Sequence, residues 1–319
     1  MKQYDVVALG ELLIDFTEQG MSGQGNPVFE ANPGGAPCNV LAMLSRLGHR
    51  TAFLGKVGDD MFGRQLETAL QEVGIETRGL KKNAEIPTTL AFVHTLPGGD
   101  RKFSFYRNPG ADMTLTEDDL EIEVLEECRI FHFGTLSMTH EGCRAATRRA
   151  VERAKAAGAI LSFDPNLRES LWRDPEEARS QILYGLGQCD ILKISDNEIV
   201  WLTGETDYDC GVAWIRERFD IPLILVSLGK SGSLAFMREQ CAKVPAVLNP
   251  HTVETTGAGD TFCACILHYV LSHGWRTYTG GELAEMLRFA NAAASIITTR
   301  KGALRVMPTE EEVRALMGE

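Results

Sequence analysis

The chain has 319 residues, of which 44 % are hydrophobic and 24 % are charged, a composition that excludes a mainly disordered or collagen-like protein. Lys and Arg number 32 against 44 Asp and Glu, and the resulting net charge of −12 argues against a body that wraps nucleic acid or an anionic membrane. An anionic ligand would need a local positive site.

Short apolar runs alternate with segments of helical periodicity, which predicts a mostly parallel sheet with helices packed against it. Residues 6–9 form the first predicted strand, followed by a helix over 39–47, a strand over 52–57 and a helix over 62–73. Further buried strands are predicted over 130–134, 160–164, 190–194 and 223–228. Ligands of such sheets bind beyond the carboxyl ends of the strands, so a site is expected there.

One stretch interrupts this alternation. Residues 88–96 and 101–107 flank Pro97-Gly98-Gly99-Asp100, which predicts a β-hairpin with its turn at 97–100. Together with an irregular, glycine-rich segment over about 16–33, this hairpin is expected to form a small sheet that projects from the main domain as a lid.

The eight cysteines stand at positions 38, 128, 143, 189, 210, 241, 263 and 265, with no C-x-x-C pair. In a chain of this size, this spacing favours reduced thiols. No apolar run reaches the ~18 residues that a membrane span requires, and the first residues lack the apolar core of a signal peptide. We therefore expect a cytoplasmic protein.

The sharpest local motif is TTGAGD at 255–260, followed by an apolar helical run over 262–271. Glycines before a helix let the backbone approach a ligand, and the free N–H groups and helix dipole favour an anion. Asp260 would repel that anion unless it faces a hydroxyl group and removes its proton while the backbone stabilises a transferring phosphoryl group. The alternative is that Asp260 only caps the helix.

Other motifs for nucleotides and metals do not fit. Gly229-Lys230-Ser231 resembles the end of a P-loop, but Ile224 stands where that loop requires its first glycine. No G-x-G-x-x-G follows the first strand, which argues against a dinucleotide site. The seven histidines lack the spacing of a zinc site.

A second glycine motif, PGGAPCN at 33–39, leads into the first predicted helix. Its glycines and the amide of Asn39 can present N–H groups and a polar side chain to sugar hydroxyls, although an ordinary helix cap is the alternative. Asp15, near a strand end, is suited to accept hydrogen bonds from two hydroxyls. An exposed loop aspartate is the alternative.

The pairing of PGGAPCN with TTGAGD resembles the ribokinase-like (pfkB) carbohydrate kinase family, and GELLID, FYRNPGAD and FDPNLR are similar to its fructokinase branch. The resemblance covers nearly the whole chain. It implies a single doubly wound α/β domain over residues 1–319, with helices flanking a mostly parallel sheet. The lid would consist of inserted segments at about 12–33 and 87–110, and in this family it often forms a dimer interface.

The resemblance also implies residue roles. Asp260 would deprotonate the primary hydroxyl of the sugar, and the backbone amides of Gly257, Ala258 and Gly259 would form the anion hole for the γ-phosphoryl group. The implied sugar-binding residues are Asp15, Gly34, Gly35, Asn39, Arg107, Asn166 and Arg168. The implied ATP-binding residues are Lys193, Glu198, Ser227, Gly229, Gly232 and Asn291, with Glu198 holding Mg²⁺ through water. Arg107 as a surface charge on the hairpin, and Lys193 and Asn291 as surface residues, are the alternatives.

Two departures from the family pattern concern ions. Ser195 replaces the first residue of the family's N-x-x-E motif, so the network around magnesium is expected to differ. Glu254 stands where relatives usually carry Asp before Thr-Thr-Gly, which puts activation by K⁺ in doubt.

The function expected from the resemblance is phosphorylation of fructose to fructose 6-phosphate by ATP with Mg²⁺. A kinase for 2-keto-3-deoxygluconate, another sugar or a riboside is the alternative within the fold, because Arg107 suits a carboxylate as well as a hydroxyl. A non-catalytic sugar sensor is the alternative of another class. The presence of Asp260 behind intact glycines argues against the sensor.

Overall fold

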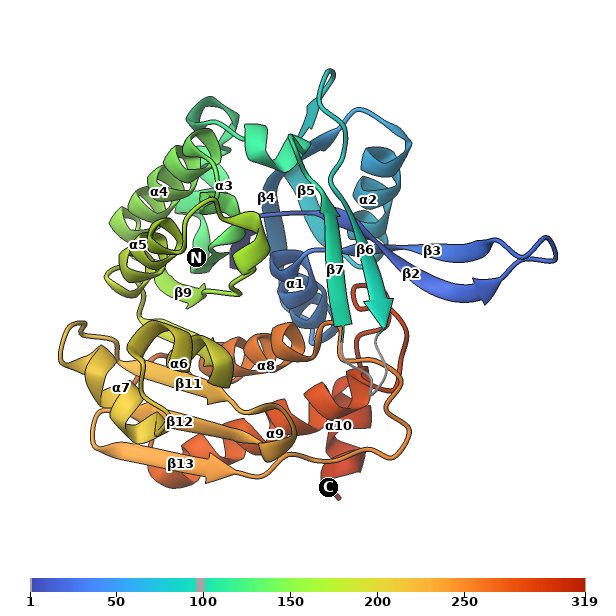
Figure 1. Ribbon diagram of the computed structural model, residues 1–319. Helices are drawn as coiled ribbons and strands as arrows, with labels where there is room; N and C mark the ends of the chain where they lie inside the picture. Colours follow the sequence, from blue (N-terminus) through green and yellow to red (C-terminus); the bar gives the residue numbers. More distant parts are fainter. Residues whose placement is uncertain (1, 96–100, 319) are drawn as a thin grey trace.

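The computed structural model describes residues 2–95 and 101–318. Its main feature is a nine-stranded sheet in the order β13-β12-β11-β10-β9-β8-β1-β4-β5 (Figure 1). The strands are β1 (Tyr4–Leu9), β4 (Thr51–Gly58), β5 (Ile75–Asn83), β8 (Cys128–Gly134), β9 (Ile160–Asp164), β10 (Ile191–Ser195), β11 (Leu223–Ser227), β12 (Ser233–Met237) and β13 (Gln240–Val244). Those from β5 to β11 run parallel, and β12 and β13 are antiparallel additions. This confirms the predicted mostly parallel sheet.

Helices cover both faces of this sheet and create two hydrophobic cores. Because side chains alternate along a strand, Val6 and Ala8 of β1 enter one core while Val7 and Leu9 enter the other. The first core contains α1 (Ala36–Arg46), α2 (Met61–Glu72), α8 (Ala258–His273), α9 (Gly280–Ile297) and α10 (Glu310–Met317). The second contains α3 (Ile122–Glu126), α4 (Glu141–Ala156), α5 (Pro175–Leu186), α6 (Asp196–Thr203) and α7 (Tyr208–Arg216).

A smaller sheet, in the order β3-β2-β6-β7, projects from the main body (Figure 1). Its strands are β2 (Leu13–Met21), β3 (Pro27–Gly34), β6 (Leu90–Thr95) and β7 (Arg101–Tyr106). The antiparallel pairing of β6 with β7 confirms the predicted hairpin strands. The predicted turn at 97–100 lies outside the described residues.

The segment over 16–33 belongs to this smaller sheet, as predicted, but it is regular and not irregular, because β2 and β3 form a long antiparallel hairpin there. Its turn is closed by a hydrogen bond from Ser22 N to Asn26 O of 2.8 Å. Most side chains near this turn are exposed, so the sequence lacks the alternation of apolar and polar residues that identifies a half-buried strand. In the described part of the chain, no helix has the length and apolar character needed to cross a membrane.

Candidate active site

A cavity of about 610 Å³ lies beyond the carboxyl ends of the parallel strands. Glu11 follows β1, Asn166 follows β9, Ser195 ends β10 and Ser227 ends β11, and all four line the cavity. Phe105 contributes from the smaller sheet. The predicted site residues that line it are Asp15, Gly35, Asn39, Asn166, Arg168, Lys193, Glu198, Ser227, Gly229, Gly257, Gly259 and Asp260.

Asp260 lies in the first turn of α8, but it does not cap the helix. The cap is Gly257, whose left-handed backbone (φ 76°) suits glycine, and Asp260 instead accepts a hydrogen bond of 2.8 Å on Oδ2 from Asn39 Nδ2. Burial raises the pKa of Asp260, whereas the Asn39 hydrogen bond and the charges of Lys193 and Arg168 lower it. The carboxylate is thus held in one orientation at the cavity wall, as a base requires.

Asn39 itself is nearly fully buried, with 4 % of its surface exposed. Its Oδ1 atom has no hydrogen-bond partner among the described residues, although Nδ2 is used by Asp260. A buried acceptor without a partner is costly unless a ligand supplies a donor. Because Asn39 lines the cavity, Oδ1 is placed to accept a hydrogen bond from a bound hydroxyl.

Lys193 and Asp164 form a buried ion pair beneath the glycine loop, with 2.9 Å between Nζ and Oδ2. Burial lowers the pKa of Lys193, but the charges of Asp164 and Glu198 outweigh it and raise that pKa. A Cβ on Gly259 would lie 3.4 Å from Lys193 Nζ. The ammonium group of Lys193 therefore lies close to the first turn of α8, and the alternative that Lys193 is a surface residue is wrong.

Ser195 and Glu198 replace the expected asparagine arrangement by a capping box at the start of α6. Glu198 Oε2 accepts hydrogen bonds from the backbone N–H and the Oγ of Ser195, each 2.8 Å, and Oε1 accepts one from Leu167 N at 2.7 Å. Burial raises the pKa of Glu198, but the charge of Lys193 and these hydrogen bonds have a larger opposite effect, so the pKa lies below its usual value. Glu198 is therefore a fixed, ionised carboxylate at the cavity wall.

Two glycines allow β3 to approach the residues after β1. A Cβ on Gly34 would lie 2.1 Å from Asp15 Oδ2, and one on Gly35 would lie 2.4 Å from the carbonyl oxygen of Glu11. Gly35 also has a φ of 122°. Only glycine fits at both positions, and Asp15 can therefore reach the cavity from β2.

Comparison with known proteins gives this geometry its context. The chain matches the model of the pfkB family carbohydrate kinases over residues 3–310. It belongs to that family. Fructokinase-1 of Zea mays is 44 % identical over 98 % of this chain and 97 % of its own, and fructokinase-2 of Solanum lycopersicum is 40 % identical over 98 % and 95 %. Among solved structures, fructokinase with bound ATP from Xylella fastidiosa superposes with a TM-score of 0.87, 31 % identity and 98 % coverage of both chains.

A more distant solved structure of the pfkB fold is a putative ribokinase II from E. coli in complex with ATP and Mg²⁺. It matches with a TM-score of 0.86 at 25 % identity over 99 % of both chains. The described residues of this pfkB protein include no group of three or more His, Cys, Asp and Glu side chains that could hold a metal. Mg²⁺ commonly retains waters and binds through one or two carboxylates and substrate phosphates, and Glu198 fits such an indirect role.

Five residues that the family resemblance assigned to ligands do not line the cavity, namely Gly34, Arg107, Gly232, Ala258 and Asn291. Gly34 and Ala258 are chain neighbours of cavity residues, and the N–H of Ala258 donates to the Thr255 carbonyl (3.2 Å). The side chain of Asn291 accepts a hydrogen bond from Ser233 Oγ (2.9 Å) and donates to the carbonyls of Val244 and Pro245. A Cβ on Gly232 would lie 2.1 Å from the Val244 carbonyl oxygen. In this pfkB protein, Asn291 and Gly232 thus hold the loop after β13 against the sheet.

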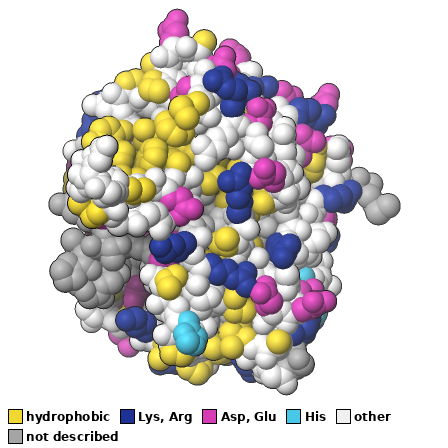
Figure 2. Space-filling view, turned by 90° about the vertical axis from the view of Figure 1, so that its right-hand side faces the viewer, with side chains coloured by type: hydrophobic (Ala, Val, Ile, Leu, Met, Phe, Trp, Pro, Cys, Tyr) yellow, Lys and Arg dark blue, Asp and Glu magenta, His cyan; other side chains and the backbone are white. Residues whose placement is uncertain are grey.

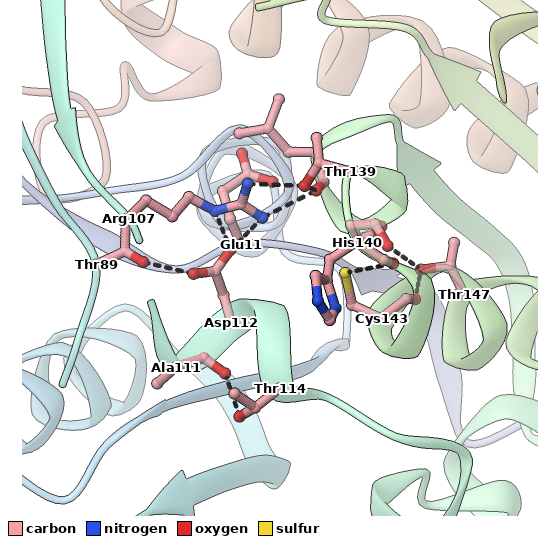
Figure 3. A network of polar contacts seen from close by, with 12 residues as sticks. Glu11, Thr89, Arg107, Ala111, Asp112, Thr114, Thr139, His140, Cys143 and Thr147 are labelled. Carbon is pink, nitrogen blue, oxygen red and sulfur yellow. Dashed lines mark hydrogen bonds and ion pairs between the residues drawn. The ribbon is translucent and has the colours of Figure 1, made fainter. Parts of the chain in front are cut away.

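Arg107, another of these residues, is neither a surface charge nor a cavity residue. Its Nε donates to Asp112 Oδ2 (2.7 Å), Nη1 to Thr139 Oγ1 (2.7 Å) and Nη2 to the Leu136 carbonyl (3.0 Å), as Figure 3 shows. Only 6 % of Arg107 is exposed. Arg107 therefore ties the end of β7 to the main body, because each nitrogen of its guanidinium group contacts a protein partner.

Several cavity residues were not among the predicted site residues, namely Glu11, Leu13, Ala36, Phe105, Leu136, Ser195, Asp196, Asn197, Thr255 and Thr256. Of these, Glu11 had a detectable signal, because it stands two residues after the end of the first predicted strand. Phe105 and Leu136 had none, since an apolar residue at a strand end is most often part of the core.

Proposed function

We propose that this protein transfers the γ-phosphoryl group of ATP to the primary hydroxyl of fructose, giving fructose 6-phosphate and ADP. The observation that carries the proposal is Asp260, oriented by Asn39 at the N-terminus of α8 with Lys193 behind the loop. The names of relatives that are 40–44 % identical, all fructokinases, support fructose as the acceptor.

In the proposed reaction, the oxygen of the sugar hydroxyl attacks the γ-phosphorus while its proton passes to Asp260. The new O–P bond forms as the bond between the γ-phosphorus and the bridging oxygen of ADP breaks. The N–H groups of Gly257 and Gly259, with the charge of Lys193, are suited to stabilise the transferring group, whereas the N–H of Ala258 already donates to the Thr255 carbonyl (3.2 Å). Positioning and charge stabilisation do most of the catalytic work in phosphoryl transfer.

The two ends of the cavity suit different ligands. Asp15, Gly35, Asn39 and Phe105 gather at the end near the smaller sheet, where we place the sugar. Ser227 and Gly229, at the other end, are placed to contact the nucleotide, with Arg168 toward the phosphates. Mg²⁺ would accompany the phosphates of ATP, with Glu198 holding one of its waters.

For monovalent ions, we expect only weak dependence on K⁺. Glu254 Oε1 accepts a hydrogen bond of 2.9 Å from Gly302 N, and the N–H groups of Val253 and Glu254 donate to the Thr298 carbonyl. These hydrogen bonds join the loop before α8 to the loop after α9 within the protein itself. The two loops therefore have a link that needs no cation.

A sugar panel with coupled ADP detection tests the proposed function. We expect fructose to give the highest kcat/KM, above 2-keto-3-deoxygluconate, ribose and aminoimidazole riboside, with similar rates in potassium and tetramethylammonium chloride. A higher kcat/KM for another acceptor would replace fructose as the substrate. Binding of fructose without ADP release would instead identify a sensor, and ADP release equally fast without sugar would argue against a lid that excludes water.

We also propose that the smaller sheet is the lid and that two copies of the chain associate through it. Phe92 stacks on Phe16 and contacts Tyr106 edge-on, with 4.9 and 5.3 Å between ring centroids, and Tyr106 is 66 % exposed. Met21 (63 % exposed) and Val28 (41 %) add exposed apolar surface to the same sheet. Figure 2 shows hydrophobic side chains gathered on the side from which this sheet projects. Such a patch is typical of an interaction surface.

Light scattering tests this association. Tyr106→Glu is expected to convert a dimer to a monomer, because a charge would be buried at the contact. Leu316→Glu, at an exposed position of α10, is the control that should leave the dimer intact. A monomeric wild-type protein at tens of micromolar would refute the proposal.

The eight unpaired cysteines support a reducing, cytoplasmic location.

A further inference from the structure

Glu11 is a buried carboxyl group of the cavity wall that the proposed reaction does not use. It lies two residues after the end of β1, only 5 % of its surface is exposed, and it lines the sugar end of the cavity. Its Oε1 atom accepts a hydrogen bond of 2.9 Å from Ala36 N, the first residue of α1. The close approach of Gly35 to the Glu11 carbonyl packs the same loop against its backbone.

The residue that orients Asp260 lies one turn further along α1. The backbone N–H of Asn39 donates to the Gly35 carbonyl, so Asn39 is fixed relative to the start of the helix. Its side chain then donates to Asp260 Oδ2. Since α1 offers no side-chain cap of its own, Glu11 supplies the missing acceptor for an N–H group in its first turn.

We propose that Glu11 is a positioning residue for Asp260, acting by fixing the start of α1 and thereby the side-chain amide of Asn39. This inference rests on the proposed function. Glu11 is not assigned a contact with either substrate. It acts through its hydrogen bond to Ala36 N and through the first turn of α1, which leads to Asn39.

The charges around Glu11 decide which variant is informative. The pKa of Glu11 is raised to about 7, chiefly by burial and to a smaller extent by the charge of Asp112, against the lowering effect of backbone hydrogen bonds and of the Arg107 charge. Figure 3 shows Glu11 beside these two side chains. The other titratable groups facing it are Cys38 on α1, Asp15 on β2, and His132 and Asp164 across a cavity of about 10 Å³. Whether it is protonated or ionised, the carboxyl group of Glu11 keeps an oxygen that can accept a hydrogen bond from Ala36 N. The side-chain amide of a glutamine has such an oxygen as well.

Two substitutions separate the hydrogen bond from the charge. Glu11→Gln retains the acceptor and is expected to have a kcat close to that of the wild type. Glu11→Met has a similar volume but no comparable acceptor, and we expect its kcat for fructose to fall roughly 10- to 100-fold because the base is misplaced. KM for ATP should change little in both variants, because the ATP end of the cavity is distant from α1.

The pH profile provides a readout that a purely structural role would not move. The hydrogen bond from Asn39 lowers the pKa of Asp260, so loss of that bond raises it. The acid limb of kcat should therefore move to higher pH in Glu11→Met and in Asn39→Ala, but not in Glu11→Gln. The double variant should lose no more activity than the worse single variant, because both act on one bond.

Asp174→Ala is the matched control, since Asp174 accepts the N–H of Glu176 at the start of α5, away from the cavity. It should lower the melting temperature while leaving kcat and the acid limb unchanged. An unshifted acid limb in Glu11→Met, or losses that multiply in the double variant, would overturn the inference. If Glu11→Met does not fold, Glu11→Ala is read in the same way. Failure of the proposed function would look different, because the wild type and Glu11→Gln would both lack fructose-dependent ADP release.

Discussion

Asp260→Asn should lower kcat for fructose phosphorylation by about 100-fold or more, with KM for ATP close to that of the wild type. The amide occupies the same space and can still pair with Asn39, but it cannot accept the proton of the attacking hydroxyl. Steady-state kinetics with fructose and ATP varied in turn, together with ATP binding by calorimetry, measure both parts of this expectation.

Asp207→Asn is the control for this experiment. Asp207 caps α7 by accepting a hydrogen bond from Cys210 N, far from the cavity, and asparagine is an equally good cap. Its kcat should equal that of the wild type. If Asp260→Asn kept near-full turnover, Asp260 would not be the base, and the proposed chemistry would fail.

Lys193→Met should cause a large loss of stability as well as of activity. Removing one partner of a buried ion pair leaves an uncompensated charge, which typically costs about 3–5 kcal/mol of unfolding free energy. Here Asp164 would lose its partner, and Glu198 its nearest positive charge. Turnover should fall as well, because the ammonium group behind the amides of the glycine loop is lost. Chemical denaturation and the fructokinase assay measure the two effects.

The sign of the pH dependence follows from the same pair. Burial already raises the pKa of Asp164, and Lys193 holds it down, so the pKa of Asp164 rises further in Lys193→Met. A carboxyl group whose pKa is higher in the folded than in the unfolded state stabilises the protein less as pH rises. The stability deficit of Lys193→Met should therefore shrink on lowering the pH from 8 to 5.5.

Lys193→Met combined with Asp164→Asn separates stability from activity. Neutralising Asp164 should recover much of the lost unfolding free energy, because no unpaired charge remains at that position. Turnover should stay low, since Lys193 is still missing. If Lys193→Met alone were as stable as the wild type, the buried ion pair would not be needed for folding.

The sequence predicted most of the central sheet because its strands are buried on both faces and read as continuous apolar runs, as in β11. It did not predict the hairpin of β2 and β3, or the strands β5, β12 and β13 of the central sheet. β2, β3, β5 and β13 are only partly buried and their apolar pattern is weak, whereas β12 is buried throughout but follows β11 after a short turn instead of a helix. Local apolar patterns indicate which side chains are buried. They do not indicate which strands form backbone hydrogen bonds with one another.

The site was predictable where the chemistry depends on a local motif. The glycines before α8 and Asp260 lie where TTGAGD placed them. Arg107 and Asn291 differ, because their side chains bind protein partners, Asp112 and Ser233. Asp112 belongs to the same FYRNPGAD motif as Arg107, but the motif does not show that the two side chains pair. Ser195 differs in the opposite way. Its change of residue type left Glu198 in place, because serine can form a capping box that holds the carboxylate.

The hydrogen bond between Asn39 and Asp260 joins residues 221 positions apart. Contacts of such long sequence separation form only after the chain has closed a large loop, and they are slow to form. During synthesis, α1 emerges long before α8. The nascent chain therefore contains Asn39 before Asp260 has been made. Phosphoryl transfer can therefore begin only when nearly the whole chain has been made and folded. The appearance of kinase activity thus marks the completion of folding.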